Sequence, residues 1–142
     1  FGWGAIMAWA AVKGTVGAVP LLIFAANICW AMAYDTIYAL MDIEDDLKIG
    51  VKSTAIFFGA GVYKALTALY AGFIALLAAA GLMSNIGVVY YITLVAAFIA
   101  AIKIVSSIKK NPSRENAFMG FLANAVIGGV ILAAVIISLN MT

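Results

Sequence analysis

The 142-residue sequence has no histidine, a single cysteine, two prolines and few charged residues, which make up 10% of the chain. Without histidine, and with Cys29 alone, zinc, haem and iron–sulfur sites built on their usual ligands are disfavoured. Cys29 lies in an apolar segment and is best interpreted as a small packing residue. The net charge of +2 is scattered along the chain, which argues against a nucleic-acid partner.

Apolar residues take the place of the missing charge. Hydrophobic side chains make up 67% of the chain, and its mean hydropathy is +1.17. An ordinary soluble domain has about half apolar and about a quarter charged residues. Several apolar segments approach or exceed the roughly 20 residues that a helix needs to cross a bilayer. The sequence therefore predicts an all-α polytopic bundle of transmembrane helices, embedded in the lipid bilayer as a single domain over residues 1–142.

Polar and glycine-rich breaks divide the chain into one partial and four full spans. As a helix, residues 1–12 would cover only about 18 Å of the roughly 30 Å apolar core of a bilayer. The four full spans are expected at about residues 20–41, 56–83, 88–108 and 115–139. Because the chain opens inside an apolar run with no charged leader, we expect it to be the C-terminal part of a longer protein.

Basic residues predict the orientation of the bundle. They gather at two loops that lie two spans apart: Lys48, Lys52 and Lys64 at one, and Lys103, Lys109, Lys110 and Arg114 at the other. The intervening turn, residues 84–87, carries no charge. The positive-inside rule places both basic loops in the cytoplasm. We therefore expect an integral protein of the bacterial inner membrane with these loops, and the acidic segment that adjoins the first of them, facing the cytoplasm.

Five of the six acidic residues lie in one short stretch, residues 35–46. At 100° per residue, an unbroken helix would place Asp42 and Asp46 within about 20° of Asp35, on one stripe. Carboxylates at a membrane edge are costly, and like charges at i, i+4 repel unless a cation neutralises them. Because carboxylate oxygens suit a hard cation, the stripe predicts a magnesium or calcium site.

Neighbouring residues have weaker assignments. On the same helix Glu44 would point to the opposite side, whereas Asp45 and Tyr38 fall next to the stripe and Asn27 lies two turns earlier. A solvated acidic loop without a ligand stays an alternative for Glu44 and Asp45. An EF-hand calcium loop does not fit, because Leu47 stands where glycine is required.

The next loop adds Lys52, Ser53 and Thr54 after a glycine at position 50. A lysine and two hydroxyls beside a carboxylate–metal site suit a phosphorylated ligand, since magnesium often bridges carboxylates to substrate phosphates. The alternative for Lys52 is a plain cytoplasmic anchor.

These residues resemble a known motif. The run Tyr34-Asp-Thr-x-Tyr-Ala-x-x-Asp42-x-x-Asp-Asp46-x-x-x-Gly50-x-Lys-Ser-Thr-Ala55 is similar to the second aspartate-rich motif of the UbiA family of membrane prenyltransferases. The match is closest to the 4-hydroxybenzoate polyprenyltransferase branch, which Ala26-Asn-Ile-x-Trp30 and the opening Phe1-Gly-Trp-Gly also resemble. The resemblance covers the whole chain, but only about the C-terminal half of a family member.

The resemblance implies a nine-helix bundle in which two aspartate-rich motifs hold Mg²⁺ ions that bridge to the diphosphate of a polyprenyl donor. The residues that match or neighbour the motif take three roles: Asp35 and Tyr38 in catalysis, Asp42, Asp45 and Asp46 at the metal, and Lys52, Ser53 and Asn27 in substrate binding. The implied activity is transfer of the polyprenyl group from polyprenyl diphosphate to the ring of 4-hydroxybenzoate, in ubiquinone biosynthesis.

The first motif and the remaining helices would lie in the missing N-terminal half of the same enzyme, so we expect the chain to be inactive alone. A family enzyme for another aromatic acceptor, of the menaquinone or tocopherol type, is the nearest alternative. A fragment of a cation-coupled transporter is a more distant one. It would place carboxylates nearer the bilayer midplane on broken helices, whereas this cluster lies at the membrane edge.

Overall fold

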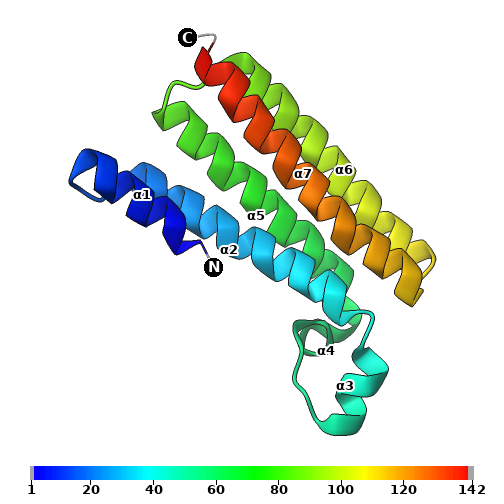
Figure 1. The fold of residues 1–142 in the computed structure, drawn as a ribbon. Coiled ribbons are helices and arrows are strands. Elements are labelled where there is room, and N and C mark those ends of the chain that lie inside the picture. Colours follow the sequence, from blue (N-terminus) through cyan, green and yellow to red (C-terminus); the bar gives the residue numbers. More distant parts are fainter. Residues whose placement is uncertain (1, 141–142) are drawn as a thin grey trace.

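The computed structural model describes residues 2–140, and its elements over that range are helices: α1 (Trp3–Lys13), α2 (Ala18–Ala39), α3 (Ile43–Ile49), α4 (Thr54–Phe58), the 3-10 helix η1 (Gly59–Gly61), α5 (Val62–Met83), α6 (Val88–Lys110) and α7 (Arg114–Asn140). The long helices α2, α5, α6 and α7 lie side by side, with α1 along the first half of α2 (Figure 1). The short helices α3 and α4 form a small lobe at one end of the bundle. This confirms the predicted all-α bundle.

Within residues 2–140, four helical segments are long and apolar enough to cross a membrane: Ala18–Ala39, Thr54–Met83, Val88–Lys110 and Arg114–Asn140. They correspond to the four predicted full spans. The predicted partial span is α1, whose 11 residues reach only about 17 Å; Phe1 lies outside the described residues. The chain is an integral membrane protein.

The span predicted as one helix over about residues 56–83 begins differently in the structure. The structure instead has α4 and η1 ahead of α5. Gly59, at the end of α4, has φ +48° and ψ −128°, a backbone conformation that L side chains rarely adopt. The chain turns at this glycine, and α4 consequently leaves the axis of α5 and packs against α2 (Figure 1).

Local sequence signals account for several helix ends. Pro20 lies in the first turn of α2, where its missing N–H has no intrahelical acceptor to lose. Gly14 ends α1 with φ +70°. Ser113 caps α7: its Oγ accepts a hydrogen bond from the backbone N–H of Asn116 at 3.2 Å.

The core between α2, α5 and α7 contains one buried polar network. Asn124 of α7 is 3% exposed, and its Oδ1 accepts hydrogen bonds from the Tyr70 hydroxyl at 2.8 Å and from Trp30 Nε1 at 3.2 Å. Its Nδ2 donates to the carbonyl of Gly120 at 2.9 Å. Because no water in the apolar core can replace these bonds, the network ties three spans together.

In addition to its hydrogen bond, Trp30 packs closely against Phe73 and Gly128. Its ring stacks on that of Phe73, with centroids 5.7 Å apart. A Cβ added to Gly128 of α7 would lie 2.8 Å from the Trp30 ring, so the absence of a side chain at Gly128 lets α7 approach α2.

Candidate functional site

The helix that was expected to continue through the acidic stretch is broken in the structure. The prediction that the carboxylates form a single stripe is therefore wrong. α2 ends at Ala39, a turn follows, and α3 begins at Ile43. Asp35 consequently lies on α2, Asp42 at the N-cap of α3, and Asp46 within α3. The acidic residues still lie at one end of the bundle, but on two helices and the turn between them.

Charge placement explains why a new helix begins here. Glu44, Asp45 and Asp46 occupy the first turn of α3, and Lys48 lies in its last turn. This distribution complements the helix dipole at both ends. Gly50, with φ +74°, ends the helix. Acids followed by a lysine and a glycine were a readable signal for a separate short helix.

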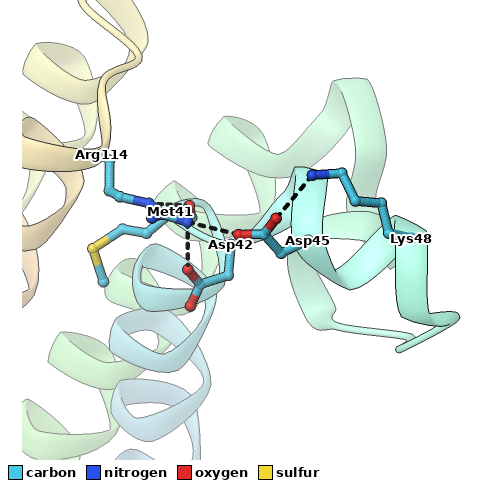
Figure 2. Close-up of polar contacts among 5 residues, drawn as sticks. All are labelled: Met41, Asp42, Asp45, Lys48 and Arg114. Carbon is cyan, nitrogen blue, oxygen red and sulfur yellow. Dashed lines mark hydrogen bonds and ion pairs between the residues drawn. The ribbon is translucent and has the colours of Figure 1, made fainter.

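Arg114, the first residue of α7, contacts the acidic turn (Figure 2). Its Nη2 lies 3.0 Å from Asp42 Oδ1 and 3.0 Å from Asp45 Oδ2, and its Nε donates to the Met41 carbonyl at 2.9 Å. In the sequence Arg114 counted only as a cytoplasmic anchor. The contact was missed because 72 residues separate Arg114 from Asp42, and only the folding of α7 against α2 brings them together.

Asp45 uses both carboxylate oxygens in ion pairs. Besides Arg114 on Oδ2, Lys48 Nζ lies 3.0 Å from Oδ1. Hydrogen bonds from Lys48 and Arg114 hold the pKa of the Asp45 carboxyl below its ordinary value. Asp45 is therefore the least available of the three predicted metal ligands.

Asp42 and Asp46 keep more of their bonding capacity. Asp42 Oδ1 bonds to Arg114, while Asp42 Oδ2 and the Asp46 carboxylate have no hydrogen bond within residues 2–140. The Asp46 N–H donates to the Asp42 carbonyl at 2.8 Å, so the two residues remain one helical turn apart. Over the described part of the chain, no group of three or more His, Cys, Asp or Glu side chains could hold a metal. A pair of carboxylates nevertheless suits Mg²⁺, which commonly takes one or two together with water and substrate phosphates.

Tyr38, predicted to act in catalysis, lies close to Asp42 in the fold. It lines a pocket of about 550 Å³ together with Asp42 and Arg114. Its ring meets that of Phe121 edge-on, with centroids 5.4 Å apart. Asp35 lies on α2 one turn before Tyr38 and is exposed, and no hydrogen bond or ion pair within residues 2–140 joins it to the other acids.

The predicted substrate-binding residues are spread more widely. Ser53 is the N-cap residue of α4, and its buried Oγ has no hydrogen-bond partner. Lys52 is exposed beside it. Asn27 lies about 18 Å of helical rise before the end of α2 at Ala39. It lines a separate apolar cavity of about 180 Å³ with Trp30 and Phe73, so the structure does not bring it to the acidic turn.

A threonine pair missed in the sequence joins the small lobe to the bundle. Thr36 of α2 is fully buried, and its Oγ1 donates to the Met32 carbonyl at 2.6 Å, so it accepts the 2.8 Å hydrogen bond from Thr54 Oγ1, at the start of α4. This bond fixes the beginning of α4, and hence the adjoining Ser53, against the end of α2.

Four apolar spans that carry a charged turn at one end define a helical integral membrane protein with a polar site at the membrane edge. The sequence model of the UbiA prenyltransferase family matches residues 1–137. The chain therefore belongs to the UbiA prenyltransferase family.

Curated relatives share this similarity over nearly the whole chain. The 4-hydroxybenzoate octaprenyltransferase of Alkalilimnicola ehrlichii is 40% identical over 141 residues, which cover 99% of this chain and 48% of that protein. The protein of the same name from Xanthomonas campestris pv. campestris is 42% identical over 142 residues, with 99% and 46% covered. The chain thus spans about half the length of the curated relatives it matches.

A solved structure shares the fold. It is described as "Structural and mechanistic insights into the biosynthesis of Digeranylgeranylglyceryl phosphate synthase in membranes", and it superposes on 92% of this chain with a TM-score of 0.74. The superposition uses 47% of that chain, at 22% sequence identity. At this identity the likeness supports the helical arrangement alone.

Proposed function

We propose that this chain supplies one diphosphate-binding half of an enzyme that transfers a polyprenyl group from polyprenyl diphosphate to the ring of 4-hydroxybenzoate, a step of ubiquinone biosynthesis. The names of the two relatives support the reaction and the acceptor. The observation that carries the proposal is the Asp42–Asp46 pair, one helical turn apart with free carboxylate oxygens, at the charged end of four apolar spans. A second acidic motif and the remaining helices would come from an N-terminal half of the same enzyme.

Asp42 and Asp46 are the residues proposed to hold Mg²⁺. Their hard oxygen donors fit this ion, and the lack of a three-carboxylate cage leaves its other positions for water and diphosphate. When bound, Mg²⁺ would neutralise the diphosphate as it departs from the prenyl group. Asp45 would contribute negative charge beside the pair rather than a direct ligand, because Lys48 and Arg114 already occupy it.

Other residues of the same end would act on the substrates. The Tyr38 ring shares a pocket with Asp42, where its face could stabilise the positive charge of the allylic group. Asp35, one turn further into the membrane, would add negative charge on the same side of α2. Lys52 and the unpartnered Ser53 hydroxyl are proposed contacts of the diphosphate. Asn27 stays a predicted substrate contact, in the apolar cavity rather than at the diphosphate.

The orientation is part of the proposal. Lys48, Lys52 and Arg114 lie at the same end of the bundle as the acidic turn, which supports a cytoplasmic location for that end in a bacterial inner membrane. The diphosphate would then bind from the cytoplasm, while the polyprenyl tail would lie against the apolar spans in the bilayer.

The test uses the full-length gene product that contains this chain, reconstituted in lipid vesicles. Prenylation of 4-hydroxybenzoate should require Mg²⁺ and should fall at least about a hundredfold in Asp42→Asn and in Asp46→Asn, because each removes a charge that holds the metal. Glu44→Gln is the matched control, since Glu44 is an exposed acid of the same helix with no polar contact within residues 2–140.

Full magnesium-dependent activity in both aspartate variants would refute the site. Preference for a menaquinone-type or tocopherol-type acceptor would instead retain the diphosphate site and replace the acceptor. Ion-coupled uptake that requires Asp35, with no prenylation, would refute the proposed enzyme activity and support a transporter function instead.

A further inference from the structure

The helix α3, which carries Asp46, has little packing of its own. None of its seven residues is buried, and Leu47 and Ile49 are 63% and 74% exposed. A pocket of about 510 Å³, lined by Ile43 of α3 and by Ile108 of α6, lies between α3 and the rest of the bundle. Apolar burial therefore contributes little to the position of α3.

Arg114 provides the polar attachment that the packing lacks. Within residues 2–140, its ion pair with Asp45 is the only hydrogen bond or ion pair that joins a side chain of α3 to another helix. The same guanidinium bonds to Asp42 and to the Met41 carbonyl, so one planar group holds three successive parts of the turn (Figure 2). A lysine has no comparable fork of fixed donors.

The position of Arg114 within its own helix points the same way. It is the first residue of α7, where the helix dipole disfavours a cation. The carboxylates of Asp42 and Asp45 compensate for this, so the arginine stabilises the contact between helices rather than the helix that carries it.

We propose that Arg114 is a positioning residue of the diphosphate site, a role that rests on the function proposed above. By holding Oδ1 of Asp42, Arg114 fixes that carboxylate with Oδ2 available to a divalent cation. By holding Asp45, it fixes α3, and with it Asp46, against the start of α7. Arg114 thus acts on the metal through the two aspartates and does not itself contact the substrate.

The experiment compares Arg114→Gln and Arg114→Lys with the wild-type full-length gene product in lipid nanodiscs. Lys109→Gln is the matched control, because it also removes an exposed cation close to the loop that precedes α7. The Lys109 side chain makes no polar contact within the described range. Two quantities are measured: amide hydrogen exchange over residues 43–50 without metal, and calorimetric affinity for Mg²⁺ in the presence of inorganic diphosphate.

In Arg114→Gln, exchange over residues 43–50 should rise on the order of tenfold, because two ion pairs and a hydrogen bond are lost. Affinity for Mg²⁺ with diphosphate should fall by roughly tenfold or more, as for other residues that orient a metal ligand. Arg114→Lys should restore part of both effects, and Lys109→Gln should change neither. Exchange over α5 should stay as in the wild type, which shows that the bundle is folded.

Unchanged exchange over residues 43–50 in Arg114→Gln would overturn the proposal. Faster exchange with wild-type Mg²⁺ affinity would overturn it too, because Arg114 would then be only a structural contact. Failure of the proposed function is a separate result: Asp42→Asn and Asp46→Asn would then bind Mg²⁺ and diphosphate like the wild type, whatever Arg114 does.

Discussion

Replacing Asn124 by leucine tests the polar network that joins three spans. The substitution introduces an apolar side chain of similar size and removes the single acceptor that Tyr70 and Trp30 share. Tyr70 is 1% exposed, so its hydroxyl would have no water to bond. Trp30 is only partly buried, and its hydrogen bond to Asn124, at 3.2 Å, is longer than that of Tyr70.

The magnitude follows from these two donors. A buried donor left without a partner costs about 1–3 kcal/mol. Side-chain hydrogen bonds between membrane helices contribute less, about 0.6 kcal/mol on average, because the unfolded chain in the membrane also finds partners. Assigning the larger cost to Tyr70 and the smaller one to Trp30, we expect Asn124→Leu to lower the free energy of unfolding by about 2–3 kcal/mol.

The assay is unfolding of the full-length gene product in mixed micelles of rising denaturing-detergent content. Tyr70→Phe alone should cost about 1 kcal/mol, since Asn124 keeps its Trp30 bond. In the Asn124→Leu background, Tyr70→Phe should be neutral or stabilising, because it removes the unpaired hydroxyl. The reasoning is refuted if Asn124→Leu changes stability by less than about 0.5 kcal/mol, or if the two substitutions are additive.

Two glycine pairs give further predictions, each with a matched control. Gly59→Ala should destabilise the protein by about 1–3 kcal/mol and raise hydrogen exchange in α4, because an alanine at φ +48° is strained. Gly61→Ala, at φ −86° and also in open space, should change little. Equal effects would contradict the account of the turn. Gly128→Ala should cost about 1–3 kcal/mol and alter the emission of Trp30, whose ring its Cβ would meet at 2.8 Å. Gly129→Ala, with nothing within 4 Å, should be silent, and a silent Gly128→Ala would disprove the close approach.

The spans could be predicted from sequence because their signal is local. Mean hydropathy over about 20 residues suffices to find a membrane helix, and all four predicted full spans are present. The first-turn position of Pro20 and the N-cap role of Ser113 were predictable for the same reason, since each depends on the chemistry of its own helix end.

The site geometry was less predictable, because the helical-phase argument assumed continuity. Acids followed by Lys48 and Gly50 indicate a separate short helix, but they do not locate the residue at which α2 ends, and the break between Ala39 and Ile43 was therefore missed. Arg114 depended on tertiary structure and gave no local signal. Asn124 did give one, as a lone amide in the middle of an apolar span, where polar groups need a partner.

The ion pairs of Arg114 also bear on the order in which the protein is made. Domains fold as they leave the ribosome, with N-terminal parts first. The acidic turn is synthesised 72 residues before Arg114, and Tyr70 is synthesised 54 residues before Asn124. Both contacts wait for the same helix, α7. When α7 inserts, it therefore acts in two places: it joins the transmembrane helices at Asn124 and fixes the acidic turn at Arg114.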